Sequence, residues 1–210
     1  MPTKYYEVRA CRSCGLRYPL MEGHAFGDRC PACMGETRAI LKRTLVLEPQ
    51  QSDISQDYPS GRGVFAVLLD NIRSAWNVGS ILRSADGFGL DHAYLCGITP
   101  TPENETVGKT SLGAQDAVPW SYHKDAVKLV MGLKKEGWKV YALEEDARAS
   151  AIDEASPPTQ QTVLILGNEV TGVDPELLDL CDAVFYIPMR GQKKSFNVAI
   201  AFGIAAYALR

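Results

Sequence analysis

Short apolar runs alternate with helical patterns from residue 64 to the end of the chain. The runs that predict buried strands are residues 64–70, 93–98, 139–143, 162–166 and 183–187. Between and after them, apolar residues recur at helical spacing, over residues 78–88, 126–133 and 198–209. This alternation predicts an α/β domain with a mainly parallel sheet of about five strands.

Two of the predicted strands stop abruptly at glycines and polar residues. Residues 162–166 lead into the polar segment 167–173, and residues 183–187 lead into the polar segment 188–198. In parallel α/β sheets, ligands bind just beyond the carboxyl ends of the strands. If these two strands are neighbours, their ends form one site.

Polar residues near the predicted helix starts have more than one interpretation. We expect Asn77 to cap the first helix and Ser195 to cap the last one, with Asn197 in its first turn. Capping alone would explain Ser195, and an exposed position on a helix would explain Arg83. Glu169 directly follows a buried strand, so we interpret it as a helix cap or a site residue.

Two common kinds of active site are excluded. A phosphate loop at residues 108–110 would need glycine five positions before Gly108, where Glu103 stands. We expect residues 109–113 to form a polar loop instead. A Ser/His/acid set is excluded because the three histidines, His24, His92 and His123, fall outside the strand ends described above.

The N-terminal part of the chain carries a metal-binding pattern. Cys11 and Cys14 form one Cys-x2-Cys pair, Cys30 and Cys33 form another, and fifteen residues separate the pairs. This spacing is typical of a tetrahedral zinc site, and four thiolates with no open position indicate a structural site. The alternative is two disulfides, which a cytosolic context disfavours.

Composition separates the cysteine-containing N-terminal part of the chain from the predicted α/β domain. Residues 48–61 are polar and contain two prolines, so we predict a zinc-ribbon-like module at 1–45, a linker at 46–62 and a second domain at 63–210. Residues 1–45 carry eight Lys/Arg and four Asp/Glu, a charge of +4, whereas the rest of the chain carries −7. The basic module on an acidic body suggests contact with a polyanion, although ordinary solvated surface would explain it equally well.

The N-terminus has no apolar core region of a secretory signal, and the longest apolar segment is too short for a bilayer span of about 20 residues. We therefore expect a soluble, cytoplasmic protein without a membrane partner.

Three stretches resemble the three sequence motifs of the SpoU family of RNA ribose 2′-O-methyltransferases, which belong to the trefoil-knotted SPOUT class. They run over residues 77–89, 166–173 and 187–198. Together they cover the second domain, and three motifs in order are far more specific than one. The sequence departs from the family at Phe196, where leucine is common, and at residues 199–201, where a small hydroxyl residue is common.

The resemblance implies a C-terminal trefoil knot that holds S-adenosylmethionine as the methyl donor. The main chain around five residues would bind the adenine and ribose of this cofactor: Leu166, Gly167, Ile187, Met189 and Phe196. It also implies an RNA substrate, either tRNA or rRNA, and a homodimer with the site at the interface.

The resemblance further implies roles for the polar candidates. An arginine at the place of Arg83 would activate the ribose hydroxyl. Because a guanidinium keeps its proton in proteins, gripping the adjacent phosphate and orienting the hydroxyl are less demanding roles. Asn77 and Glu169 would position Arg83 and the ribose, and Ser195 and Asn197 would line the methyl-transfer site.

Two alternatives to this enzyme stay open. One is a catalytically inert RNA-binding adaptor that uses the N-terminal module, and the other is a methyltransferase that acts on another RNA position. All five polar candidates are present, which favours the enzyme.

Overall fold

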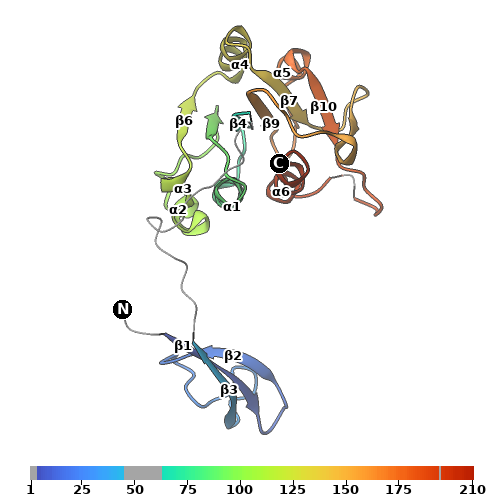
Figure 1. The fold of residues 1–210 in the computed structure, drawn as a ribbon. Helices are drawn as coiled ribbons and strands as arrows, with labels where there is room; N and C mark the ends of the chain where they lie inside the picture. The colour runs from blue at the N-terminus through green and yellow to red at the C-terminus, as the bar shows by residue number, and fades with distance from the viewer. Residues whose placement is uncertain (1–3, 45–62, 194) are drawn as a thin grey trace. The chain divides into compact units, whose positions relative to one another are not determined.

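The structure, a computed structural model, describes residues 4–44, 63–193 and 195–210. The chain divides into two compact units, residues 1–57 and 58–210, which are described separately below (Figure 1). The predicted linker at residues 46–62 lies outside the described residues.

The N-terminal unit contains a small antiparallel sheet. Its strands are β1 (Tyr5–Cys11), β2 (Arg17–Met21) and β3 (Thr37–Thr44), in the order β2-β1-β3. One face of the sheet is covered by the loops between the strands. On that face the buried Arg9 donates to the Thr37 hydroxyl at 2.9 Å and pairs with Glu7 and Asp28. These contacts fix the loop that carries the second cysteine pair.

The second unit is built on a seven-stranded sheet in the order β6-β5-β4-β9-β7-β10-β8, and every pairing in it is parallel (Figure 1). The strands are β4 (Phe65–Asp70), β5 (His92–Cys96), β6 (Trp120–His123), β7 (Lys139–Leu143), β8 (Ser150–Ala151), β9 (Thr162–Leu166) and β10 (Ala183–Tyr186). The predicted parallel sheet is confirmed, but the expected number of about five strands was too low. β6 and β8 were missed because both are short edge strands with half-buried or exposed residues.

Helices cover both faces of this sheet. They are α1 (Ala75–Gly87), α2 (Glu105–Ser111), α3 (Ala114–Ala117), α4 (Ala126–Lys135), α5 (Pro175–Leu180) and α6 (Val198–Ala208), with a short 3-10 turn η2 (Ile152–Glu154). α1 and α6 pack on one face and α4 and α5 on the other (Figure 1). The two central strands are buried along their whole length, so alternate residues of β4 feed the two cores.

Three local expectations were wrong. Residues 109–111 belong to α2, which the Asn104 side chain caps by accepting from the Thr106 N–H at 2.9 Å, so they do not form a polar loop. α1 begins one turn earlier than expected, and α6 begins after Asn197, which is its N-cap in place of Ser195.

The earlier start of α1 has a consequence for the site. Ser74 is the N-cap, and its hydroxyl accepts from the Asn77 N–H at 3.4 Å. The side chain of Asn77 is therefore released from capping.

Within the described ranges, no helix has the length and apolar composition that a membrane crossing requires.

Candidate cofactor and catalytic site

The carboxyl ends of three neighbouring strands open onto one cavity. β9 and β10 do not pair with each other, because β7 lies between them and pairs with both. The segments that follow β7, β9 and β10 enclose a cavity of about 350 Å³. The predicted site at the two strand ends therefore has a third wall that the sequence reasoning left out.

The cavity has an apolar floor and an acidic, polar rim. The apolar lining consists of Leu143, Leu166, Val170, Ile187, Met189, Phe196, Val198 and Ala201. The polar lining includes three carboxylates, Glu144, Glu145 and Glu169, together with Asn168, Ser195 and Asn197. A volume in this range, apolar walls and a few converging polar groups are typical of a small-molecule site.

The loop after β9 can only be built with glycine at two positions. A Cβ added to Gly167 would lie 2.1 Å from the main-chain nitrogen of Val173, because the loop folds back onto its own start. Gly172 has φ +75°, a left-handed conformation that favours glycine. Main-chain hydrogen bonds of 3.0 and 2.9 Å between Asn168 and Gly172 close the turn in both directions.

Carboxylates of the neighbouring strands hold this loop in place. Glu144, at the end of β7, accepts from the Val173 N–H at 2.9 Å. Asp70, at the end of β4, accepts from the Asp174 N–H at 3.2 Å and from the Asn71 amide at 2.7 Å. Burial raises the pKa of Asp70, although these two hydrogen bonds act in the opposite direction. The loop is therefore tied to strands on both sides of β9.

Glu169 is the centre of a hydrogen-bonded network at the rim. Its carboxylate accepts from the main-chain N–H groups of Arg73 at 2.9 Å and Ser74 at 3.1 Å, and from the Asn77 side-chain amide at 2.9 Å. Partial burial acts to raise the pKa of Glu169, but these donors outweigh it and hold the pKa below its usual range. Glu169 is thus a carboxylate fixed by the start of α1.

Asn77 connects this network to the C-terminal segment. Its side-chain oxygen accepts from the Asn197 amide at 3.0 Å, and the Asn197 oxygen in turn caps α6 by accepting from the Ala199 N–H at 2.9 Å. The amide orientations in this chain are mutually consistent, since each oxygen faces a donor. Three predicted site residues from distant parts of the sequence, Asn77, Glu169 and Asn197, therefore lie together.

The remaining predicted residues divide into two groups. The five predicted cofactor-binding residues all line the cavity: Leu166, Gly167, Ile187, Met189 and Phe196. Ser195 also lines it and is exposed. Arg83 is exposed on α1, six residues after Asn77 and so about 9 Å further along the helix axis. In the described part of the chain, Arg83 is not among the residues that line the cavity.

Sequence reasoning missed Glu144, Glu145 and Tyr186 as lining residues. A signal for the first two was present, because both directly follow the predicted strand 139–143. The rule that sites form at carboxyl ends of parallel strands applies to that strand as well. The strand order that brings it beside 162–166 is not visible in local patterns.

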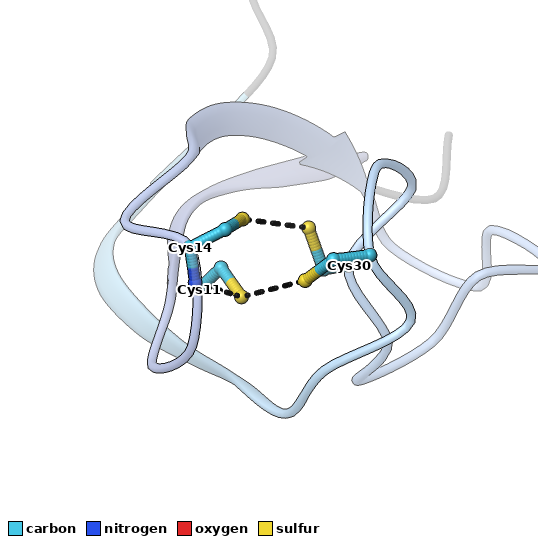
Figure 2. A group of neighbouring side chains, drawn as sticks. Cys11, Cys14 and Cys30 are labelled. Atoms are coloured by element: carbon cyan, nitrogen blue, oxygen red, sulfur yellow. Dashed lines mark hydrogen bonds between the residues drawn. The ribbon is translucent and has the colours of Figure 1, made fainter.

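The four N-terminal cysteines form a separate cluster. Cys11 and Cys14 face the second pair across a short gap, as Figure 2 shows for Cys30. The Sγ atoms lie within 4.8 Å of one another, with Cys11 3.5 Å from Cys33 and Cys14 3.7 Å from Cys30. Four sulfurs around a tetrahedral Zn²⁺ would be about 3.8 Å apart. Disulfide sulfurs are about 2.0 Å apart, so the cysteines are free and the alternative pairing does not apply.

Main-chain N–H groups stabilise the thiolate form of Cys11. The N–H groups of Cys14 and Ser13 point at the Cys11 sulfur at 3.4 and 3.3 Å, and they lower the pKa of Cys11 to about 6. Hydrogen bonds from main-chain N–H groups to a thiolate stabilise the deprotonated form that binds metal. The residues present therefore fit a tetrahedral thiolate site.

The fold and the cavity define an α/β protein with a small-molecule site at the carboxyl edge of a parallel sheet, and the comparisons identify its family. Residues 64–207 match the model of the SpoU rRNA Methylase family. This match covers more than half of the chain, so the chain belongs to the SpoU methylase family. The predicted fold class and family are thereby confirmed.

Several relatives have described activities. The chain is 36% identical over 146 residues to the 23S rRNA (guanosine(2553)-2′-O)-methyltransferase RlmP of Bacillus subtilis, covering 69% of this chain and 57% of that protein. It is 35% identical over 144 residues to the tRNA (guanosine(18)-2′-O)-methyltransferase of Thermus thermophilus, covering 67% of this chain and 71% of that protein.

A solved structure supports the same assignment. An AdoMet-bound rRNA methyltransferase from Sinorhizobium meliloti superposes with a TM-score of 0.67 at 29% identity, over 71% of this chain and 56% of that chain. The match therefore spans little more than half the length of the Sinorhizobium meliloti protein and of the Bacillus subtilis relative. Together the two units of the present chain contain one SpoU domain and one cysteine module.

Proposed function

We propose that this chain is an S-adenosylmethionine-dependent methyltransferase that methylates a ribose 2′-hydroxyl in RNA, either tRNA or rRNA. The observation that carries the proposal is the network in which Asn77 joins Glu169 to Asn197 at the rim of the cavity. The relatives named above act on the 2′-hydroxyl of guanosine in 23S rRNA and in tRNA.

The cavity suits the proposed cofactor. When bound, S-adenosylmethionine supplies an electrophilic methyl group on a positively charged sulfur. The apolar floor would hold the adenine against Leu166, Ile187 and Phe196, and the main chain at Gly167 and Met189 would bind its polar edge. The three rim carboxylates suit the positive charge of the sulfonium and the amino group.

The polar residues around the cavity have distinct tasks in this proposal. Asn77 and Glu169 hold each other in place and position the ribose, and Ser195 and Asn197 line the place where the methyl group is transferred. Arg83 grips a phosphate next to the target ribose and orients its hydroxyl. A guanidinium keeps its proton in proteins, so Arg83 acts by orientation and not as a base.

The direct test is methyl transfer from labelled S-adenosylmethionine to RNA. The RNA is then digested, and its products are separated after alkali treatment, because only 2′-O-methylation protects the neighbouring phosphodiester and leaves a modified dinucleotide. A labelled mononucleotide in place of the dinucleotide would show that the acceptor is another RNA position. Donor binding without any transfer to RNA would identify an inert binding protein.

Zinc is the metal that we propose for the four cysteines. Their number, their spacing and the distances between their sulfurs all match a closed, structural tetrahedral site. A reducing cytoplasm, which we propose as the location of the protein, would keep the thiols available for the metal. Elemental analysis of the purified protein should find one zinc per chain, and iron in its place would contradict the assignment.

We also propose a homodimer with the site at its interface. α1 and α6 pack against each other and expose large apolar side chains: Trp76 is 65%, Ile200 56% and Tyr207 79% exposed. Exposed apolar groups on packed helices are typical of subunit contacts. A dimer would also allow Arg83 of one subunit to act at the cavity of the other.

Mixing two inactive variants tests the shared site. Arg83→Ala and Ser195→Ala are each expected to abolish methylation while the fold is retained. If Arg83 acts across the interface, a mixture allowed to exchange subunits should recover activity at about a quarter of its sites, because half of the dimers then contain one intact site. A mixture as inactive as its components, in a protein shown to exchange subunits, would place Arg83 and Ser195 at the same subunit's site.

A further inference from the structure

The N-terminal sheet has one open face with an unusual composition. Directly opposite residues of an antiparallel pair share a face, as do alternate residues of one strand. The strand register therefore places nine residues on the face opposite Arg9 and Cys11: Tyr6, Val8 and Ala10 from β1, Arg17, Pro19 and Met21 from β2, and Arg38, Leu41 and Arg43 from β3. We call this surface the arginine face.

The bulge in β3 is what keeps these residues together. Val8 lies opposite Leu41, and Ala10 lies opposite Arg38, so four residues of β3 (38–41) match three of β1 (8–10). One extra residue, Ile40, absorbs the difference. Without this bulge, Arg38 would project to the covered side.

Within residues 4–44, no carboxylate neutralises the positive charge on the arginine face. All three arginines are exposed, and none of the nine positions is an Asp or Glu. Three of the four carboxylates in residues 4–44 are engaged elsewhere, since Glu7 and Asp28 pair with Arg9, and Glu22 pairs with Lys42. The face therefore combines three guanidinium groups, none of them paired with a carboxylate of the described residues, with an apolar centre.

The apolar centre is also accessible. Met21 is 40% and Leu41 37% exposed, and the half-buried Tyr6 lies between Met21 of β2 and Arg43 of β3. From Tyr6 to Ala10 the face is about 13 Å long. A flat surface that offers an aromatic ring and arginine planes beside apolar side chains fits unstacked nucleotides, whose bases stack on such groups while their phosphates meet the arginines.

From these observations we infer that the arginine face binds single-stranded RNA, and this inference rests on the proposed function of the second unit. The charge balance favours RNA over a protein partner. The rest of the chain carries −7, which opposes the approach of a polyanion, so the attractive charge must come from residues 1–45, which carry +4. The zinc site would offset part of this charge, but its thiolates lie on the covered side with Cys11.

The test compares two triple variants of the full chain. Arg17→Gln, Arg38→Gln and Arg43→Gln together remove three charges from the arginine face. The matched control removes three charges from the same unit but outside that face: Arg12→Gln, Arg29→Gln and Lys42→Gln. Zinc content and donor binding are measured for both proteins to confirm that each unit is folded.

The probe is a fluorescent single-stranded oligoribonucleotide of mixed sequence, titrated at several salt concentrations. Each phosphate contact to a single strand contributes about 0.7 to the slope of log K against log salt, so the face variant should lose about 2 from the slope and about 100-fold in affinity at 0.1 M salt. The control should lose much less. Methylation should show a raised KM for RNA and an unchanged kcat.

Tyr6→Leu tests the stacking part of the inference separately. It keeps the apolar contact but removes the ring, so affinity for the single strand should fall about 10-fold while affinity for a duplex stays the same.

Equal RNA affinities of the two triple variants would overturn the inference, and a lower melting temperature in the face variant alone would then show that the three arginines stabilise the protein. A wild-type protein that binds the donor but binds no RNA at low salt would also overturn it. Failure of the proposed function is recognised by a different result, the absence of methyl transfer by the wild type at saturating RNA.

Discussion

Glu169→Gln is the substitution that tests the rim network most directly. Three N–H donors converge on the carboxylate, from the main chain of Arg73 and Ser74 and from the side chain of Asn77. Glutamine is the same size but offers one oxygen and an NH₂ group. Whichever way the amide is turned, its NH₂ faces a donor. Asn77 cannot compensate by turning over, because its oxygen already accepts from Asn197.

The magnitude follows from the number of donors that lose their partner. At least one hydrogen bond to a charged acceptor is lost, which in a buried site is worth about 1.5–3 kcal/mol. Glu169 is exposed, so water replaces part of this, and we expect about 1 kcal/mol of lost stability. For a unit of this size that corresponds to a melting temperature lower by about 2–4 °C. The effect on methylation should be much larger, about 100-fold or more, because a displacement of 1 Å in a positioning group is enough for such a loss.

The matched control is Glu145→Gln. Glu145 lines the same cavity and is also exposed, and the substitution removes the same charge. Thermal unfolding, donor binding by calorimetry and methyl transfer to RNA are measured for both variants. If Glu169→Gln matches Glu145→Gln in melting temperature and turnover, the network has no role in holding the site.

Two further substitutions test the cofactor loop and the cysteine site. Gly167→Ala places a methyl group against the main chain of the same loop, so it should destabilise the protein by about 2–3 kcal/mol and abolish donor binding. In the control Gly191→Ala, the added Cβ meets no atom within 4 Å, so neither effect is expected. Thermal unfolding measures the stability, and calorimetry measures the donor binding. Cys30→Ser should remove the metal and unfold residues 1–45 while leaving the unfolding transition of the second unit unchanged, as measured by elemental analysis and circular dichroism.

The apolar pattern was sufficient to predict the sheet because its central strands are buried on both faces. Residues 65–69 and 163–166 are continuous apolar runs, and such runs are what a parallel sheet between two helical layers requires. Trp120–His123 gives no such signal, because an edge strand keeps polar and half-exposed residues.

The composition of the site was harder to predict than its location. The glycine and polar segments after residues 166 and 187 were found from the sequence, and they do line the cavity. The third wall was missed because the order of strands depends on how distant segments pair. The network was missed for a different reason: a shift of one turn in the start of α1 changes Asn77 from a helix cap into the partner of Glu169.

If the chain methylates a ribose as proposed, the same network bears on how the ribose hydroxyl loses its proton. A general base at the site would have to accept a proton near neutral pH. The three N–H donors around Glu169 lower its pKa and keep it ionised from pH 6 to 9, which disfavours that role. The contribution of Glu169 to stability is present above the pKa of an unfolded glutamate, about 4.3, and is lost as the pH falls through its lowered folded value. If Glu169 only positions the ribose, wild type and Glu169→Gln should differ in kcat by the same factor at every pH from 6 to 9, where Glu169 is ionised. A factor that changes with pH within this range would show instead that Glu169 titrates near neutral pH in the working enzyme, as a general base must.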